Sequence, residues 1–288
     1  MKVNMRDSGI ARLIKRVARI TWPRVGACLP GVLGRGLVVE DTVVSLTTYG
    51  PRLEAVDAAI FSILQGSVRP SKLILVVNEE LPLSVAHRLQ RFEKYGLEVL
   101  RSEDIGPHKK YHPVVERGLP AHVSLVTADD DIFYGRHWLR DLRNMHLAHP
   151  EDVICGWAKR IVIKNDAIAG YHDWVDVVGM EAATHHFAIG CAGTLYPPSM
   201  VAALKAAGKD FLRCCPRADD VWLHATAVRT GHRIRQVTRQ FIHPIHLPGT
   251  QESALKVTNH LPDGNDKAIH ATYTQEDVGR IVQSVALA

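Results

Sequence analysis

The sequence predicts an α/β fold built on an open, mostly parallel sheet with flanking helices. Apolar, β-branched runs such as Thr42–Thr47 and Lys72–Val77 alternate with segments whose apolar residues recur at helical spacing. These runs are apolar throughout, which is typical of parallel strands that are buried on both faces of a sheet. The length of 288 residues and the hydrophobic content of 46% suit a globular protein with a sizeable core.

The first half shows this alternation clearly. Ser84 is expected to cap the second of its helices, and Pro150 is expected to end the last one. The predicted elements are a strand at Thr42–Thr47, a helix at Leu53–Leu64, a strand at Lys72–Val77, a helix at Ser84–Tyr95, strands at Leu97–Leu100 and His122–Thr127, and a helix from about Arg136 to His149.

The second half is less regular, and Gly231 is expected to end its clearest helix. The predicted elements are a strand-like segment at Val153–Lys164, a loop at Tyr171–Glu181, helices at Ser199–Ala207 and Ala218–Arg229, a strand at Arg233–His243, and a short C-terminal helix after a loop beyond Leu247. Between them, His186–Tyr196 runs through two glycines to Pro197–Pro198. No linker divides the chain in the middle, so we expect one domain.

The net charge of +5 is concentrated at the N-terminus. Met1–Gly26 carries seven basic residues and one acidic residue, which leaves the rest of the chain at −1. Such a body lacks the broad basic face that nucleic-acid binding uses, so we expect no nucleic-acid partner. If Ile10–Thr21 is helical, it forms a basic amphipathic helix that either lies on an anionic membrane surface or packs on the body.

Five cysteines occur without a C-x-x-C pair, which predicts reduced thiols rather than a disulfide framework or a structural zinc site. No apolar stretch is long enough to span a membrane, and the N-terminus lacks the features of a secretory signal. We therefore expect a cytoplasmic protein, with a possible peripheral position on the inner face of the cytoplasmic membrane through residues 1–26.

Three consecutive carboxylates, Asp129, Asp130 and Asp131, follow the predicted strand at His122–Thr127. Ligands of open parallel sheets bind at the carboxyl ends of the strands, which is where this triplet lies. Adjacent carboxylates repel one another unless a cation compensates them, and Mg²⁺ or Mn²⁺ takes oxygen ligands of this kind. The alternative is an acidic turn that caps the next helix.

A second acidic pair, Asp219 and Asp220, opens the helix predicted after Pro216. Acids at this position stabilise the helix dipole. A carboxylate buried beside another acid is also suited to act as a general base, because its pKa rises toward neutrality. The spacing does not choose between these two interpretations.

These segments together resemble the GT-A-fold, family-2-like bacterial glycosyltransferases of the surface-polysaccharide type. The resemblance covers roughly Thr42–Lys267. The segments that carry it are VSLTTYGPRL (Val44–Leu53), KLILVVN (Lys72–Asn78), HKKYHPVVE (His108–Glu116), VTADDDIFYGRHWL (Val126–Leu139), GCAGTLYPP (Gly190–Pro198), CPRADDVWL (Cys215–Leu223) and GTQESAL (Gly249–Leu255). It implies a tail and linker at 1–37 and one catalytic domain at 38–288, with a nucleotide-binding half at 38–150 and an acceptor half with the C-terminal segment at 151–288.

The resemblance also implies roles for particular residues on the donor side. Thr47, Tyr49 and Arg52 would hold the nucleotide base and ribose, and Asp129 would bind the ribose or the donor sugar. Asp131 would bind a divalent metal, Mn²⁺ or Mg²⁺, which bridges the two phosphates of a UDP- or GDP-linked sugar.

On the acceptor side, Asp220 would be the general base and Asp219 would hold the sugar or the acceptor hydroxyl. Many relatives have Glu-Asp at this pair, so the choice of base between the two acids stays open. The implied reaction is transfer of the sugar, with inversion, to a glycan or lipid-linked glycan acceptor.

Two further groups leave alternatives open. His243 and His246 are both candidates for a metal-binding histidine, and their spacing does not choose between them. Lys109 and Lys110 could reach a diphosphate or form a solvated basic turn. Trp138 and Trp222, on predicted helices, are expected to serve packing.

Two rival functions remain at this stage. The first is a nucleotidyltransferase or Mg²⁺-dependent phosphotransferase, and the second is a non-catalytic module that binds nucleotide-sugars. The chain lacks the G-x-x-x-x-G-K-[ST] phosphate loop, which disfavours P-loop chemistry.

Overall fold

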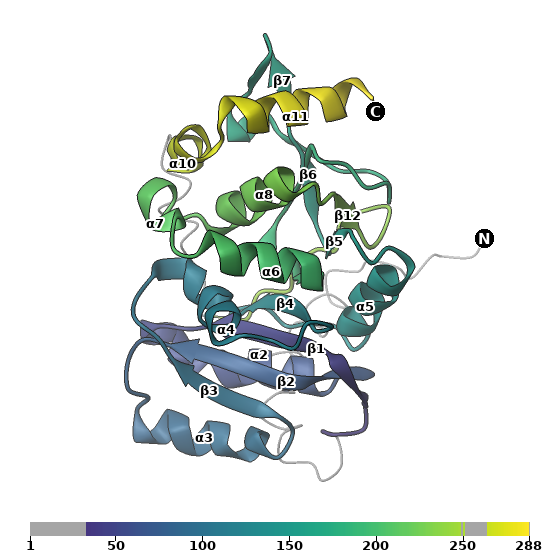
Figure 1. Ribbon diagram of the computed structural model, residues 1–288. Helices are drawn as coiled ribbons and strands as arrows, with labels where there is room; N and C mark the ends of the chain where they lie inside the picture. The colour runs from purple at the N-terminus through teal and green to yellow at the C-terminus, as the bar shows by residue number, and fades with distance from the viewer. Residues whose placement is uncertain (1–32, 249, 251–263, 288) are drawn as a thin grey trace, which may run out of the picture.

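A computed structural model of the chain describes residues 33–248, 250 and 264–287. Its centre is a seven-stranded sheet with the order β12-β5-β11-β4-β1-β2-β3 (Figure 1). β11 is antiparallel to both of its neighbours, and the other six strands run parallel. The strands are β1 (Leu37–Thr47), β2 (Val68–Val77), β3 (Leu97–Arg101), β4 (Ser124–Asp129), β5 (Val153–Cys155), β11 (Thr194–Tyr196) and β12 (Ile234–Gln236). The expected open, mostly parallel α/β sheet is confirmed.

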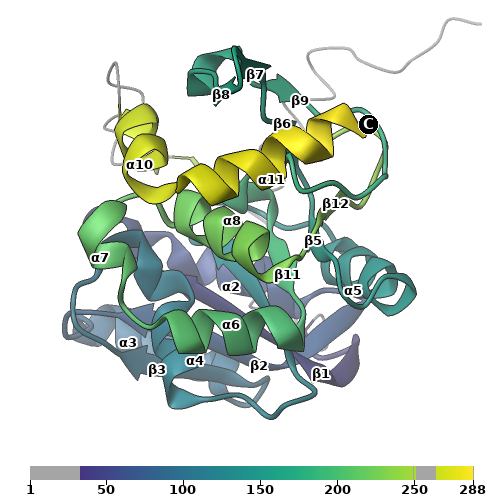
Figure 2. The same ribbon diagram turned by 45° about the horizontal axis from the view of Figure 1, so that its top comes forward.

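Helices cover both faces of this sheet (Figures 1 and 2). One face packs against α2 (Val56–Leu64), α3 (Leu83–Glu93) and α5 (Trp138–Ala148), and the other against α4 (His112–Arg117), α6 (Pro198–Ala207) and α8 (Asp219–Thr230). The remaining helices are α7 (Phe211–Cys214), α10 (Gly264–Thr272) and α11 (Gln275–Ala286), with short 3-10 turns η1 (Gly50–Glu54), η2 (Gly106–Lys110), η3 (Tyr171–Asp173) and η4 (Gly190–Ala192).

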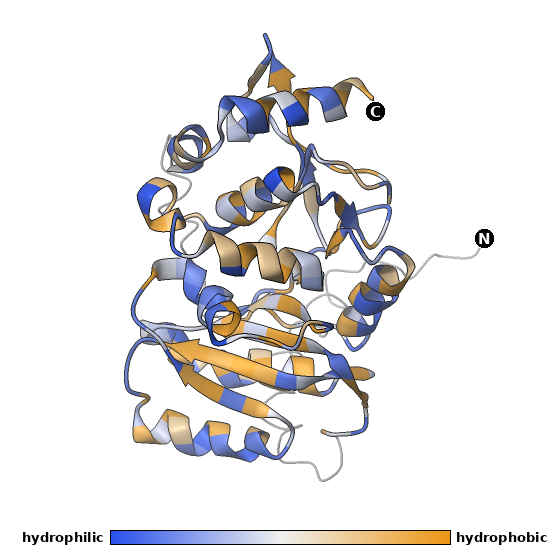
Figure 3. Ribbon diagram, viewed as in Figure 1, coloured by the Kyte–Doolittle hydropathy of each residue, from blue (hydrophilic) through white to orange (hydrophobic). Residues whose placement is uncertain are grey.

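Successive residues of the central strands enter two different cores. Val43 belongs to one buried cluster and Val44 to the other, and Leu125 and Val126 divide in the same way. This is the period of two that a strand imposes on its side chains. The apolar colour of β1 and β2 in Figure 3 is therefore explained by burial on both faces.

Two small antiparallel sheets extend the second half of the chain. One has the order β10-β6-β9, and the other pairs β7 with β8. Their strands are β6 (Ala158–Arg160), β7 (Ile163–Lys164), β8 (Ala167–Ile168), β9 (Val175–Asp176) and β10 (His186–Ala188).

Several element boundaries differ from the expectation. The strand expected over Val153–Lys164 is divided into β5, β6 and β7. Gly156 follows β5 and lies so close to η4 that a Cβ there would be 2.7 Å from the Ala192 carbonyl oxygen. The strand expected over Arg233–His243 is only three residues long. The loop expected at Tyr171–Glu181 contains η3 and β9.

The ends of the helices agree with the sequence predictions in some cases and differ in others. α3 begins at Leu83 with Pro82 at its N-cap, so the predicted Ser84 cap is wrong. α8 ends as predicted at Gly231, which adopts the left-handed conformation at φ 77°. Two helices, α10 and α11, follow where one was expected, and a Thr274–Asp277 capping box opens α11.

Other sequence expectations have mixed outcomes. Trp138 and Trp222 are buried as predicted. Within the described ranges, no helix is long and apolar enough to cross a membrane. The basic helix predicted at Ile10–Thr21, and most of the GTQESAL segment, lie outside the described residues. The division into a tail at 1–37 and a domain at 38–288 stays a prediction.

Candidate active site

The predicted acid triplet lies at the carboxyl edge of the sheet. β4 ends at Asp129, which is in register with Thr47 at the end of β1. The Thr47 hydroxyl donates a hydrogen bond of 2.8 Å to the Val76 carbonyl oxygen of β2. Thr47 therefore joins the ends of three neighbouring strands at the edge where open parallel sheets bind ligands.

Arg52, in η1, compensates the next two acids of the triplet. Its guanidinium lies 2.8 Å from an oxygen of Asp130 and 3.2 Å from an oxygen of Asp131. The Tyr49 ring lies 5.7 Å from the same guanidinium, within range of a cation–π contact. The structure thus places Tyr49 and Arg52 beside the triplet, whereas their role in holding the nucleotide base and ribose stays a prediction.

The two lysines of η2 have different partners. Lys109 donates hydrogen bonds of 2.7 Å to both Asn78 and Asp104. The Lys110 ammonium lies 2.6 Å from Asp129 and 3.3 Å from Asp219. Lys110 is therefore a buried cation that links the two acidic groups predicted from the sequence.

The acids of α8 differ in their surroundings. Asp219 is buried against Lys110, whereas Asp220 accepts a hydrogen bond of 3.2 Å from the Gly190 backbone amide. A Cβ at Gly190 would be 2.7 Å from a carboxylate oxygen of Asp220. The close approach explains why glycine occupies this position.

The turn η4 is connected to both acidic groups. The Tyr134 hydroxyl accepts a hydrogen bond of 2.7 Å from the Asp129 amide and donates one of 3.3 Å to the Cys191 carbonyl oxygen. Gly190, one residue before Cys191, binds Asp220. The two acidic groups are thus fixed relative to each other through η4 as well as through Lys110.

The local charges shift the pKa values of these acids in opposite directions. Burial, together with the neighbouring Asp219 charge, raises the pKa of Asp220 to about 7. Burial also acts to raise the pKa of Asp219, but the charge of Lys110, together with His108 and the hydrogen bonds to the carboxylate, lowers the pKa on balance. Of the two acids, Asp220 has the pKa suited to accept a proton near neutral pH.

Burial likewise raises pKa values in the triplet. The pKa of Asp130 is raised to about 6 even though Arg52 opposes the shift. The pKa of Asp131 is raised by burial and by Asp129, and Arg52, followed by His246, opposes this increase. Arg52 therefore does not fully compensate the negative charges of Asp130 and Asp131.

The structure separates the two candidate histidines. The segment around His246 pairs with the residues after the triplet, since His246 bridges Ile132 and the Leu247 amide donates a 2.7 Å hydrogen bond to the Asp131 carbonyl oxygen. His243 instead lies with its ring 4.3 Å from the Phe241 ring. Only His246 lies beside Asp131.

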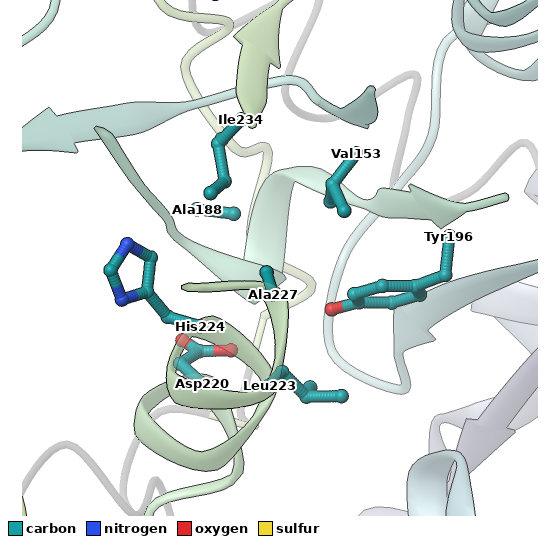
Figure 4. A pocket seen from close by; sticks show the side chains of 8 residues that line it. All are labelled: Val153, Ala188, Tyr196, Asp220, Leu223, His224, Ala227 and Ile234. Atoms are coloured by element: carbon teal, nitrogen blue, oxygen red, sulfur yellow. The ribbon is translucent and has the colours of Figure 1, made fainter. Parts of the chain in front are cut away.

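A small cavity of about 10 Å³ lies behind Asp220 and is large enough for about one water molecule. Figure 4 shows Asp220, Leu223, His224 and Ala227 on one face of α8, with the Tyr196 ring approaching from β11. His224 is fixed on both ring nitrogens, since Nε2 donates to the Thr184 carbonyl oxygen and Nδ1 accepts from the Tyr273 hydroxyl. Asp220 is thus the carboxylate among the residues that line this cavity.

The edge fits a divalent cation by its charge and its donor types. Four carboxylates, Asp129, Asp130, Asp131 and Asp219, are paired with two fixed cations, Arg52 and Lys110, and the charge of Asp220 also acts on Lys110. Oxygen atoms from Asp131 and an imidazole nitrogen from His246 are donors that Mg²⁺ or Mn²⁺ accepts. Among the residues that the structure describes, no three His, Cys, Asp or Glu side chains are grouped so as to hold a metal ion by themselves.

Some site residues were not assigned from the sequence. The sequence assigns no partner to Lys110, because two adjacent lysines give no sign of which one points toward the acids. Gly190 and Tyr134 lie in quoted motifs, but their hydrogen bonds depend on strands that are distant in sequence. The sequence marks Gly190 and Tyr134 only by their positions within these motifs.

No family model matches the chain, and no curated protein matches it either. Among solved structures, the chain is similar to S. aureus TarS with UDP-GlcNAc, at 13% identity and a TM-score of 0.46, over 70% of this chain and 57% of the TarS chain. It is similar to GalNAc-T7 with UDP, GalNAc and Mn²⁺, at 9% identity and a TM-score of 0.45, over 72% of this chain and 44% of the other.

A synthetase of another class is similar to the same degree. This is CMP:2-keto-3-deoxy-manno-octonic acid synthetase with CTP, at 8% identity and a TM-score of 0.43, over 78% of this chain and 98% of the other. Of the TarS chain solved with UDP-GlcNAc, this chain spans a little over half. Similarity at these levels does not extend to activity.

Proposed function

We propose that the protein is a glycosyltransferase of the GT-A type that moves a sugar from a UDP- or GDP-linked donor to a glycan or lipid-linked glycan acceptor. The observation that carries this proposal is the bridge of Lys110 between Asp129 and Asp219. It brings the acids at the end of β4 and the acids at the start of α8 to one edge of the sheet. Group transfer requires this arrangement, because donor and base must face the same reacting carbon.

On the donor side, Thr47, Tyr49 and Arg52 would hold the base and ribose, and Asp129 would bind the ribose or the donor sugar. Lys109, held by Asn78 and Asp104, lies at the neighbouring strand end, and its predicted contact with the diphosphate would require it to exchange those partners. The donor therefore occupies the β1 and β2 side of the edge in this proposal.

We assign the divalent metal to Asp131 and His246, because His243 points to Phe241 instead. When bound, the metal would stabilise the negative charge that develops on the departing nucleoside diphosphate. Asp131 and His246 would fix its position beside the donor phosphates.

Asp220 would act as the general base. It would take the proton of the acceptor hydroxyl while the hydroxyl oxygen bonds to the anomeric carbon and the bond from that carbon to the diphosphate breaks. Asp219, kept ionised by Lys110, would accept a hydrogen bond from the sugar or acceptor. The attack and the departure occur on opposite faces of the carbon, so the product has inverted configuration.

Titration calorimetry with UDP and GDP tests the donor site. We expect one of the two nucleotides to bind in the presence of Mn²⁺, with affinity falling more than tenfold when Mn²⁺ is omitted or in Asp131→Ala. Asp173→Ala, which alters an exposed acid paired with Lys164, is the matched control and should bind like the wild type. Equal affinity with and without Mn²⁺ would contradict the metal assignment.

For residues 1–26, we propose contact with an anionic membrane surface on its cytoplasmic side, supported by their seven basic residues. Flotation with vesicles that contain phosphatidylglycerol tests this. The full-length protein should float, and a variant with Arg12, Lys15, Arg16 and Arg19 changed to Gln should not. Equal flotation of both would contradict the proposal.

A further inference from the structure

Two aromatic side chains stack on each other beside the candidate active site. The Trp157 and Phe241 rings lie 4.6 Å apart, with an angle of 17° between their planes. Both residues are only partly buried, unlike core aromatics such as Phe187 and Phe211. Packing of the core therefore does not account for this aromatic pair.

The topology places the aromatic pair at the catalytic edge. Trp157 follows the end of β5 by two residues, and Phe241 follows the end of β12 by five. Both strands run parallel to β4, so their carboxyl ends lie at the edge where β4 presents Asp129. In the strand order they lie on the opposite side of β4 from β1, which leads to the proposed nucleotide-binding residues.

Backbone hydrogen bonds connect the aromatic pair to Asp220. The Trp157 carbonyl oxygen accepts a 2.9 Å hydrogen bond from the Ile189 amide. The next residue, Gly190, donates its amide proton to Asp220. Trp157 is therefore connected to the proposed general base through two backbone amides, those of Ile189 and Gly190.

A second connection leads from the pair to Asp131. The Ile242 amide, next to Phe241, donates a 2.9 Å hydrogen bond to the Gly156 carbonyl oxygen, next to Trp157. The chain then continues to His246, which pairs with the residues after Asp131. The pair is thus connected through the backbone to the segments that carry Asp220 and Asp131, on the opposite side of β4 from the proposed nucleotide-binding residues.

Polar groups surround the pair. The Trp157 indole donates a 2.8 Å hydrogen bond to Asp176, which fixes the orientation of the ring. Asp176 also lines a groove of about 1090 Å³, whose walls include Arg160, Arg233 and Ser284. Sites for small polar ligands combine aromatic surfaces with a few fixed polar groups in this way.

We propose that Trp157 and Phe241 form the binding site for the terminal sugar ring of the acceptor, a subsite that rests on the proposed glycosyltransferase function. A pyranose presents a face of C–H bonds, and an aromatic ring attracts the positive edges of such groups through its negatively charged face. A ring held on Trp157 would direct a hydroxyl toward Asp220. The groove, which extends from Asp176 toward the C-terminal end of α8, would receive the following residues of the acceptor, with Arg160 on its wall to bind an anionic group.

Saturation-transfer NMR with methyl glycosides of glucose, galactose, mannose, rhamnose and N-acetylglucosamine tests this subsite without requiring turnover. We expect at least one glycoside to bind the wild-type protein, with affinity falling about tenfold in Trp157→Ala and much less in Trp157→Phe, which keeps a ring. Tyr95→Ala, a partly buried aromatic at the β3 side of the sheet, is the matched control and should bind like the wild type. Phe241→Leu serves as a second variant if Trp157→Ala does not fold.

The possible outcomes test the sugar subsite independently of the proposed glycosyltransferase function. Unchanged glycoside binding in both Trp157→Ala and Phe241→Leu, or no binding of any glycoside to the wild type, would overturn the subsite. A parallel loss of UDP or GDP affinity in Trp157→Ala would also overturn it and would assign the pair to the nucleotide base, which stacks on aromatic rings as well. Failure of the wild type to turn over any nucleotide-sugar contradicts the proposed function, whereas the glycoside measurement still decides whether the pair binds sugars.

Discussion

Replacement of Lys110 by Met tests the structural link between the two acidic groups. The Lys110 ammonium lies 2.6 Å from Asp129 and 3.3 Å from Asp219, with the side chains of Lys110 and Asp219 only 11% and 12% exposed. Removing one partner of a buried ion pair leaves an uncompensated charge and typically costs about 3–5 kcal/mol. We expect the free energy of unfolding of Lys110→Met to be lower by about this amount at pH 8.

The deficit should shrink at acidic pH. In the wild type the pKa of Asp219 is lowered, so its stabilising contribution is complete at every pH above the unfolded value and is lost only as the pH falls through the folded value. Without Lys110, burial would raise the pKa of Asp219 above the unfolded value. Protonation then stabilises the variant below that raised pKa by about 1.4 kcal/mol per pH unit. Between pH 8 and pH 5 we therefore expect the deficit of Lys110→Met to become smaller.

Urea denaturation followed by tryptophan fluorescence at pH 8 and pH 5 measures both effects. Lys209→Met is the matched control, because Lys209 pairs with Glu103 on the exposed surface and its loss should change little at either pH. A deficit for Lys110→Met that equals that of Lys209→Met would refute the buried bridge. A large deficit of the same size at both pH values would refute the charge argument.

The remaining predictions concern the proposed chemistry. Because the pKa of Asp220 is about 7 and only its ionised form accepts a proton, kcat/KM should fall about tenfold per pH unit below pH 7; a flat profile from pH 5 to 8 would move the base elsewhere. In Gly190→Ala the new Cβ would be 2.7 Å from Asp220, so turnover should fall at least tenfold while calorimetry shows unchanged UDP or GDP affinity; full activity would show that the position of Asp220 is not critical. His246→Ala should raise the Mn²⁺ concentration for half-maximal activity at least tenfold, and His243→Ala should leave that concentration unchanged; the reverse result would exchange the two histidines.

The sheet could be predicted from the sequence because its central strands are apolar on both faces. Thr42–Thr47 and Lys72–Val77 are mostly apolar, so the sequence predicts them as buried strands. They lie within the observed strands β1 and β2, respectively. The short strands β5, β11 and β12 are three residues each, which is too short for a period to show. Their pairing depends on contacts across long sequence separations, so their ends could not be read from local composition.

The acids of the candidate site stand out in the sequence, whereas the contacts of its lysines do not. Asp129–Asp131 and Asp219–Asp220 stand out because carboxylates follow a strand or open a helix. Lys110 does not stand out, since its role depends on the direction in which η2 turns it relative to Lys109. The aromatic pair was missed for the same reason, because Trp157 and Phe241 are distant in sequence and meet only through the strand order.

The pH dependence of Asp220 also shows what sequence reasoning can and cannot supply. Two adjacent acids at a helix start predict that their pKa values interact. Only the structure shows that Lys110 binds Asp219 and that the Gly190 amide binds Asp220, which separates the two acids into an ionised partner and a group with a pKa near 7. These contacts support the proposal that Asp220 rather than Asp219 is the base.

The most direct test of the central claim is the release of nucleoside diphosphate from a panel of UDP- and GDP-linked sugars with Mn²⁺, by the wild type and by Asp220→Asn. The account predicts release by the wild type with at least one donor, faster when glycosides are added, and a loss of at least a hundredfold in Asp220→Asn with donor affinity retained. Equal release by Asp220→Asn, or no release by the wild type with any donor, would contradict the account.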